Sequence, residues 1–125
     1  MLWRDARLRV VLVADADYAG YCRVIWNSHV AEMTQLTPDD RGHCMQAVFA
    51  VEAVLREQMR PDKINLASLG NFTPHVHWHV IPRYRDDAHF PQAIWAARQR
   101  DPDNTRACRV DVGVLRQRMR DMLAA

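Results

Sequence analysis

The order of hydrophobic and polar residues near the start of the chain predicts two short strands. Residues 8–14 and residues 21–26 are both rich in β-branched and apolar side chains. Between them, residues 15–20 form a turn-like stretch that contains two aspartates and ends on a glycine. Because the connection is short, we expect the two strands to pair as an antiparallel hairpin.

A long helix is predicted next, from Pro38 to about residue 59. Thr37 can cap its first turn through the hydroxyl, proline is favoured at the first helical position, and the acidic pair that follows suits the positive end of the helix dipole. Arg60 and Pro61 mark its end. One apolar stripe, at steps of three and four residues, runs along the helix: Cys44, Val48, Val51, Leu55 and Met59.

The middle of the chain predicts two further strands. They cover residues 64–69 and 75–82, and a Gly-Asn turn signal separates them. Residues 85–106 are polar and contain two prolines, so we expect a surface loop with a short helical piece at residues 93–98.

A second helix is predicted from about Asp111. Its apolar residues recur at helical spacing. No repeat or linker divides residues 1–125, so the chain is predicted to be a single α+β domain with an antiparallel sheet. The spaced apolar residues of the second helix are Val112, Leu115, Met119, Met122 and Leu123.

Composition and charge narrow the classes of function. With 125 residues, 49% of them hydrophobic and 26% charged, the chain has globular composition and room for one core. A formal net charge of +2 is too small for a dedicated nucleic-acid binder. A run of about 18 apolar residues and a signal-peptide pattern are both missing, so we expect no membrane association and a cytoplasmic protein. Small domains bury a small fraction of their surface, which favours a homodimer.

Three of the six histidines alternate with apolar residues in the last predicted strand. His75, His77 and His79 are separated by Val76 and Trp78. In a strand, alternate side chains share a face, so the three imidazoles are expected to form a row with neighbours about 7 Å apart. Such a row is difficult to explain by packing, because a buried imidazole without partners loses its hydrogen bonds. The row is therefore the candidate functional site.

Two chemistries could use this row. The imidazoles could bind zinc and form a metal hydrolase. Alternatively, one neutral imidazole could attack phosphorus and form a covalent phospho-histidine, while its neighbours donate hydrogen bonds to phosphate oxygens. The flanking residues are the neutral donors Asn71 and Thr73 and the cation Arg83, and no carboxylate lies between Asn65 and Arg85. This composition favours the second chemistry.

The segment His-Val-His-Trp-His-Val-Ile at residues 75–81 resembles the signature of the histidine triad, or HIT, family. The Gly-Asn pair before it, the Pro-Arg pair after it, and Leu-Thr-Pro-Asp-Asp at residues 36–40 extend the resemblance. The resemblance implies a HIT-like α+β fold, with an antiparallel sheet of about five strands, one long central helix and a C-terminal helix. It also implies a homodimer.

The resemblance further implies a nucleotide hydrolase or nucleotidyl transferase that acts on nucleoside phosphoramidates or dinucleoside polyphosphates. His77 would be the nucleophile, and His79 would contact the phosphate and the leaving group. His75 would orient His77, partly through its backbone carbonyl. The substrate would be a purine nucleotide, and neither a cofactor nor a metal is expected.

Substrate-binding residues are assigned around this row. Asn71 would replace a glutamine that is common in the family as the amide that binds phosphate, with Thr73 as a neighbouring donor. Asp15 would bind the ribose hydroxyls, since a carboxylate can accept two hydrogen bonds. Leu12 and Val13 would line the base pocket, with hairpin core as the plain alternative.

One position departs from the family pattern. Tyr21 stands where the family commonly has a fourth histidine, so its hydroxyl could form a hydrogen bond but could not supply an imidazole. A non-catalytic nucleotide-binding module therefore stays open beside the zinc hydrolase. The other histidines, at positions 29, 43 and 89, look isolated and receive no function. Trp95 is expected to cover the pocket or the dimer interface.

Overall fold

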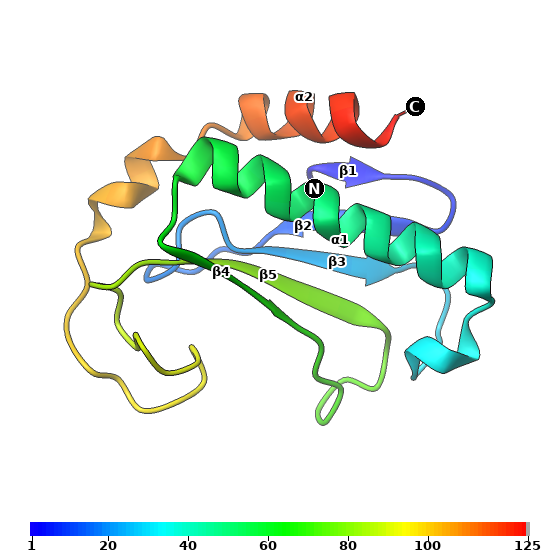
Figure 1. The fold of residues 1–125 in the computed structure, drawn as a ribbon, viewed down its shortest axis with the longest axis horizontal. Helices are drawn as coiled ribbons and strands as arrows, with labels where there is room; N and C mark the ends of the chain where they lie inside the picture. The colour runs from blue at the N-terminus through cyan, green and yellow to red at the C-terminus, as the bar shows by residue number, and fades with distance from the viewer. Residues whose placement is uncertain (125) are drawn as a thin grey trace.

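A five-stranded antiparallel sheet forms the centre of the molecule (Figure 1). The computed structural model describes residues 1–124, without the side chains of Asn104 and Cys108. The strands lie in the order β1-β2-β3-β5-β4, so β5 is an inner strand and β4 is an edge. The strands are β1 (Trp3–Arg4), β2 (Leu8–Leu12), β3 (Cys22–Trp26), β4 (Lys63–Ala67) and β5 (His77–Arg83).

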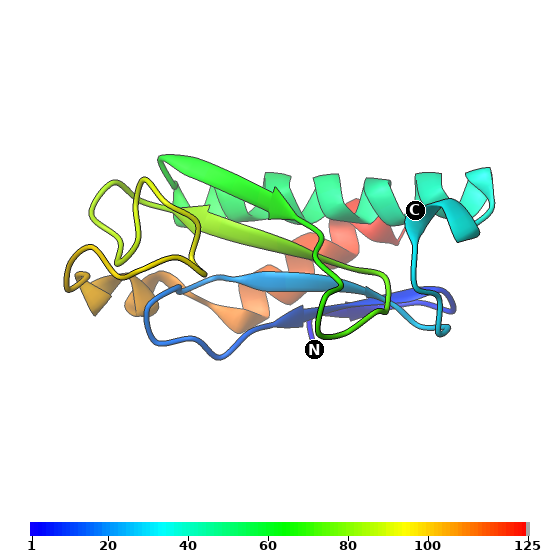
Figure 2. The same cartoon turned by 90° about the horizontal axis from the view of Figure 1, so that it is seen from below.

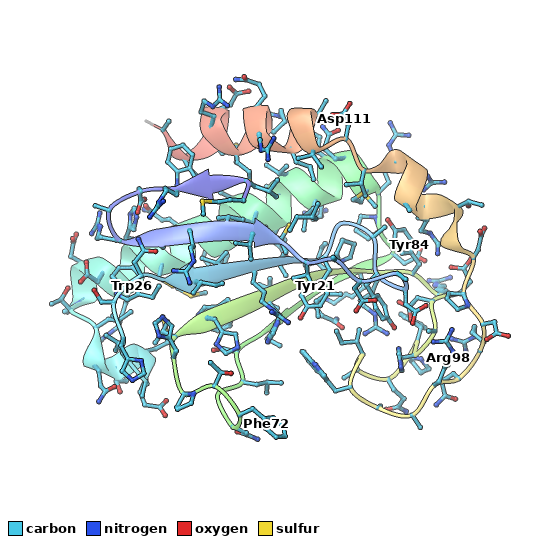
Figure 3. The ribbon with its side chains drawn as sticks, turned by 180° about the vertical axis from the view of Figure 1, so that it is seen from behind. Tyr21, Trp26, Phe72, Tyr84, Arg98 and Asp111 are labelled. Atoms are coloured by element: carbon cyan, nitrogen blue, oxygen red, sulfur yellow. The ribbon has the colours of Figure 1, made fainter. Side chains whose placement is uncertain are left out.

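Two α-helices cover one face of this sheet. Helix α1 (Pro38–Met59) crosses in front of the strands in Figure 1 and lies behind them in Figure 3. Helix α2 (Val112–Leu123) packs beside α1 and contacts β1 (Figure 2). Short 3₁₀ helices at Met33–Gln35 and Asn104–Arg109 precede α1 and α2. None of these helices, within residues 1–124, has the length and apolar composition needed to cross a bilayer.

The core lies between the helices and the sheet, and alternation along the strands creates it. Every second residue of β3 is buried against the helices, as are Leu8 and Val10 of β2, while the other residues of these two strands are only partly buried. The apolar stripe predicted for α1 is buried throughout, which confirms it. Burial of this stripe against the sheet is what stabilises α1. Members of the core include Leu8, Val10, Val24, Val48, Val51, Leu55, Met59, Val80, Leu115 and Met119.

Both ends of α1 follow the prediction. The Thr37 hydroxyl accepts a hydrogen bond from the Asp40 amide at 3.1 Å, and Pro38 occupies the first helical position. The helix ends where Arg60 adopts a left-handed conformation, with φ of 48°, before Pro61. The hairpin and the start of α2 after Asp111 are also confirmed. The chain therefore has the α+β architecture that its sequence predicts.

The structure corrects two of the predicted elements. Strand β5 begins at His77 rather than at residue 75. The Val76 amide donates to the carbonyl of Val30 instead of to a strand partner, although the Val76 carbonyl still accepts from the Trp26 amide of β3. Residues 93–98 form turns and no helix. Short helices need an apolar face to bury, and this segment leaves Trp95 51% exposed. The pattern did not predict β1, which is only two residues long.

Candidate active site

The second face of the sheet carries the histidines. His77 and His79 point from β5 to the side opposite the helices, where β3 supplies their neighbours. Ile25 lies opposite His77, and Arg23 lies opposite His79. Figure 3 shows this side of the sheet, with the loop of Phe72 below the strands toward the left and the loop of Arg98 at the lower right. The site is therefore built on rigid strands and flanked by loops.

An open cleft of about 460 Å³ lies over this face. Its lining combines imidazoles, two guanidinium groups and a few apolar side chains, and no carboxylate contributes to it. A pocket with these donors favours an anionic ligand. The lining residues are Arg9, Arg23, Ile25, His29, Thr73, Pro74, His75, His77 and His79.

The ring of His77 is oriented by the chain itself. Its Nδ1 lies 2.6 Å from the backbone carbonyl oxygen of His75, which can only accept a hydrogen bond. Nδ1 therefore carries the proton, and the neutral ring keeps a lone pair on Nε2. Because His77 is partly exposed in the cleft, this nitrogen is available to attack an electrophile.

His79 is held as a neutral imidazole. Burial lowers the pKa of His79 to about 4, and repulsion from a protonated His77 and from Arg23 adds to this effect. Its Nδ1 lies 2.5 Å from the Tyr21 hydroxyl. Burial raises the pKa of Tyr21, so the phenol stays protonated and can donate this bond. When it does, the remaining proton of His79 sits on Nε2, where it can be donated to a ligand.

This burial has a consequence for stability. Folded His79 stays neutral down to about pH 4, whereas unfolded His79 takes up a proton near pH 6.5. Acidification between these values therefore favours unfolding. Because of His79, the free energy of unfolding should be about 2–3 kcal/mol lower at pH 4.5 than at pH 7. Urea unfolding of wild type and His79→Gln at both pH values measures the difference. Equal loss of stability in the two proteins would contradict the neutral assignment.

His75 lies outside β5 and has a structural role. Its Nε2 is 2.5 Å from the carbonyl oxygen of Trp26, and its Nδ1 is 3.3 Å from Nδ1 of His29. The row of three equivalent imidazoles is thus wrong in part, because only His77 and His79 share the strand face. The interpretation of His29 as isolated is also wrong, since it lines the cleft.

Two further histidines have partners away from the cleft. His43 bonds to Asp5 at 2.8 Å, and His89 bonds to the hydroxyl of Tyr18 at 2.5 Å. Both were expected to be isolated, so that interpretation is wrong for them as well. Sequence spacing could not show these contacts, because each joins residues at least 38 positions apart.

Trp95 lies next to the histidines. Its ring centroid is 5.0 Å from that of His79, in an edge-to-face arrangement. Trp95 therefore covers one side of the His79 imidazole. This agrees with the first of its two expected roles, which was to cover the pocket. Trp78, between the two histidines, packs against the main core, as alternation along the strand predicts.

The predicted substrate-binding residues lie in different places. Thr73 lines the cleft with the histidines, whereas Asn71 is exposed and lines a neighbouring hollow next to His75. Leu12 packs against the main core, and Val13 packs against a small cluster around Tyr21. Asp15 accepts a hydrogen bond from the Asp17 amide at 2.9 Å, within the loop between β2 and β3.

Sequence patterns did not assign the two arginines of the cleft, Arg9 and Arg23, to the site. A signal for them was present, because each alternates with core residues along its strand and so shares a face with the histidines. The strand order that brings them beside β5 could not be deduced from alternation alone.

The histidine row gives no support to a zinc site. In the part of the chain that the structure describes, no three histidine, cysteine, aspartate or glutamate side chains are grouped closely enough to hold a metal ion. The rings of His77 and His79 stand nearly perpendicular, at 86°.

The site is thus an oriented imidazole over a cationic cleft, carried by an antiparallel α+β domain. The chain belongs to the HIT domain family, whose model matches residues 1–86. This membership supports a role in nucleotide binding or hydrolysis. Comparison with curated proteins gave no match.

Solved structures show the same fold. A histidine triad protein, blr8122, from Bradyrhizobium japonicum is 26% identical, with a TM-score of 0.80, and the match covers 94% of this chain and 88% of that one. A histidine triad protein from Marinobacter aquaeolei VT8 is 23% identical, with a TM-score of 0.79 and coverage of 97% and 88%. A third, SMc02904 from Sinorhizobium meliloti 1021, is 24% identical, with a TM-score of 0.71 and coverage of 93% and 83%.

Proposed function

We propose that the chain is a nucleotide hydrolase or nucleotidyl transferase that acts through a covalent intermediate on His77. The substrates would be nucleoside phosphoramidates or dinucleoside polyphosphates, with a purine base. The observation that carries this proposal is the hydrogen bond from His77 Nδ1 to the carbonyl of His75, which leaves Nε2 as a nucleophile in a cationic cleft.

The reaction would have two balanced steps. Nε2 of His77 forms a bond to the α-phosphorus while the bond from phosphorus to the leaving group breaks, and the leaving group departs with that electron pair, an amine taking up a proton as it leaves. Water then attacks the same phosphorus and releases a proton to solvent, the electron pair of the bond to Nε2 returns to the nitrogen, and nucleoside monophosphate is released with neutral His77 restored. A metal is not needed in either step, because the cleft supplies cations and N–H donors to the phosphate oxygens.

His79 and Tyr21 would assist this transfer. With Nδ1 occupied by the Tyr21 hydroxyl, Nε2–H of His79 would donate to a phosphate oxygen or to the leaving group. Tyr21 would thereby replace one function of a supporting histidine, because its hydroxyl would fix the tautomer of His79. Its phenol remains protonated, so it does not add a second titrating group.

The remaining assignments concern the nucleotide. We propose that Thr73, which lines the cleft, and Asn71, which lines the neighbouring hollow beside His75, contribute neutral donors to phosphate. Asp15 would bind the ribose, because no hydrogen bond to its Oδ2 occurs among residues 1–124. Val13 would contact the base from the cluster near Tyr21.

Trapping of the intermediate tests the proposed function. The protein is mixed with adenosine phosphoramidate or a diadenosine polyphosphate in the presence of chelator, quenched rapidly and measured by intact mass. A mass increase equal to an adenylyl group on wild type, absent in His77→Ala, is the expected result. Turnover that stops in chelator and returns with zinc would overturn the covalent histidine mechanism.

We also propose that the protein is a homodimer. Strand β4 is an edge strand whose outer backbone groups are free to pair, and Phe49 of α1 is 53% exposed one turn before Glu52, which lines the hollow beside β4. Phe49→Glu is expected to weaken self-association at least about tenfold, because it places a charge in an apolar contact. Sedimentation velocity over a range of concentrations measures this. A monomeric wild type would contradict the proposal.

A further inference from the structure

Two arginines stand beside the histidines on the same face of the sheet. Arg23 of β3 is directly opposite His79 of β5. Arg9 of β2 is opposite Ile25, and Val11 is opposite Arg23, so the two arginines are diagonal neighbours across β2 and β3. Diagonal residues on one face of an antiparallel pair are about 7–8 Å apart, a spacing that two adjacent phosphate groups can bridge.

These arginines differ from the five that are paired with carboxylates. Arg7, Arg83, Arg98, Arg106 and Arg118 each form an ion pair with aspartate or glutamate, whereas neither Arg9 nor Arg23 does so within residues 1–124. Within the same described residues, the only side-chain hydrogen bond of Arg9 runs from Nη1 to the neutral amide oxygen of Asn27, at 3.0 Å.

Arg23 is held in place with donors unused. Its guanidinium carbon lies 5.6 Å from the centre of the Tyr21 ring, which orients the group by a cation–π contact. Its Nε is buried and has no hydrogen-bond partner in the described part of the chain. A buried donor normally has a partner, and a guanidinium in a cleft without carboxylates typically receives one from a bound anion.

We propose that Arg23, assisted by Arg9, binds the phosphate chain of the leaving group, so that the substrate carries at least two phosphates. The inference rests on the proposed function and selects dinucleoside polyphosphates over phosphoramidates. As His77 Nε2 bonds to the α-phosphorus, the bond from that phosphorus to the bridging oxygen breaks, and the oxygen keeps the electron pair. Arg23, which lies opposite His79, stabilises the negative charge that develops on this oxygen. An amine leaving group takes up a proton as it departs and carries no such charge.

Binding of inorganic tripolyphosphate tests the subsite without requiring turnover. Isothermal titration calorimetry should show that Arg23→Leu weakens binding at least about tenfold, since a charge-assisted contact is lost, and that Arg23→Lys retains part of it. Arg56→Leu, which removes an exposed arginine from α1 on the far side of the sheet, is the charge-matched control and should bind within about twofold of wild type. Thermal unfolding shows whether each variant is folded. Unchanged binding by folded Arg23→Leu would overturn the proposal.

Kinetics separate this inference from the proposed function. Arg23→Leu should lower kcat/KM for a diadenosine polyphosphate by about 10- to 100-fold and change that for adenosine phosphoramidate by less than about threefold. An equal loss of kcat/KM for both substrates would overturn the proposal of a leaving-group subsite but would not contradict the proposed hydrolase activity. If wild type cleaves neither substrate, the proposed hydrolase fails, and the tripolyphosphate titration still decides whether Arg23 binds a phosphate chain.

Discussion

Replacement of His77 by asparagine is expected to lower kcat for the proposed hydrolysis at least about a thousandfold, since the nucleophile that divides the reaction into two easier steps is lost. Asparagine can still donate to the carbonyl of His75, so the local backbone keeps its hydrogen bond. Residual activity would come from the cleft cations and His79, which can stabilise phosphate charge without forming a covalent bond.

The matched control is His43→Asn. His43 pairs with Asp5 and contacts Trp26, outside the cleft, so its loss should leave kcat within about threefold of wild type. His77 is partly exposed, and its replacement should change the free energy of unfolding by less than about 1 kcal/mol. Steady-state kinetics and urea unfolding of the same samples measure both effects. Wild-type turnover by His77→Asn would exclude His77 as the nucleophile.

Asp87→Ala is expected to destabilise the protein by about 3–5 kcal/mol, because it leaves the buried cation of Arg83 without its carboxylate. Arg83 and Asp87 are 2% and 1% exposed, and Arg83 Nε donates to Asp87 at 2.7 Å. The same carboxylate accepts bonds from the amides of Tyr84, His89 and Phe90 at 2.8–3.1 Å. It therefore fixes the start of the loop that carries Trp95 to the histidines.

Thermal and urea unfolding of Asp87→Ala and Asp86→Ala measure this effect. Asp86 is the neighbouring aspartate and is 57% exposed, so its loss should cost less than about 1 kcal/mol. A loss for Asp87→Ala that is no larger than that of Asp86→Ala would show that the buried pair is unimportant for stability.

The contribution of Asp87 also depends on pH. Burial alone would raise its pKa, but hydrogen bonds from Arg83 and from the backbone outweigh burial and lower the pKa to about 2. The unfolded carboxyl titrates near pH 3.8, so the stabilisation is fully present above about pH 4 and is lost as the pH falls toward 2. The stability difference between wild type and Asp87→Ala should narrow over that interval.

Local patterns were sufficient for most of the fold. Helix α1 could be placed at both ends because capping by Thr37, proline at the first position and a terminal Arg60-Pro61 act on neighbouring backbone groups. Strands β2 to β5 could be placed because alternation with a period of two follows from strand geometry. The start of β5 was misplaced by two residues, since the Val76 amide bonds to Val30, 46 positions away, instead of to a strand partner.

The sequence by itself determined the fold class and the common face of His77 and His79, because these residues lie two positions apart and any strand places such residues on one face. Tertiary structure alone decided what surrounds them. Strand order placed β3 beside β5, which brought Arg23 and Tyr21 to His79 and so set its protonation and tautomer. Periodicity describes one strand at a time, whereas the charge and hydrogen bonds of a site come from neighbours that only the folded sheet brings together.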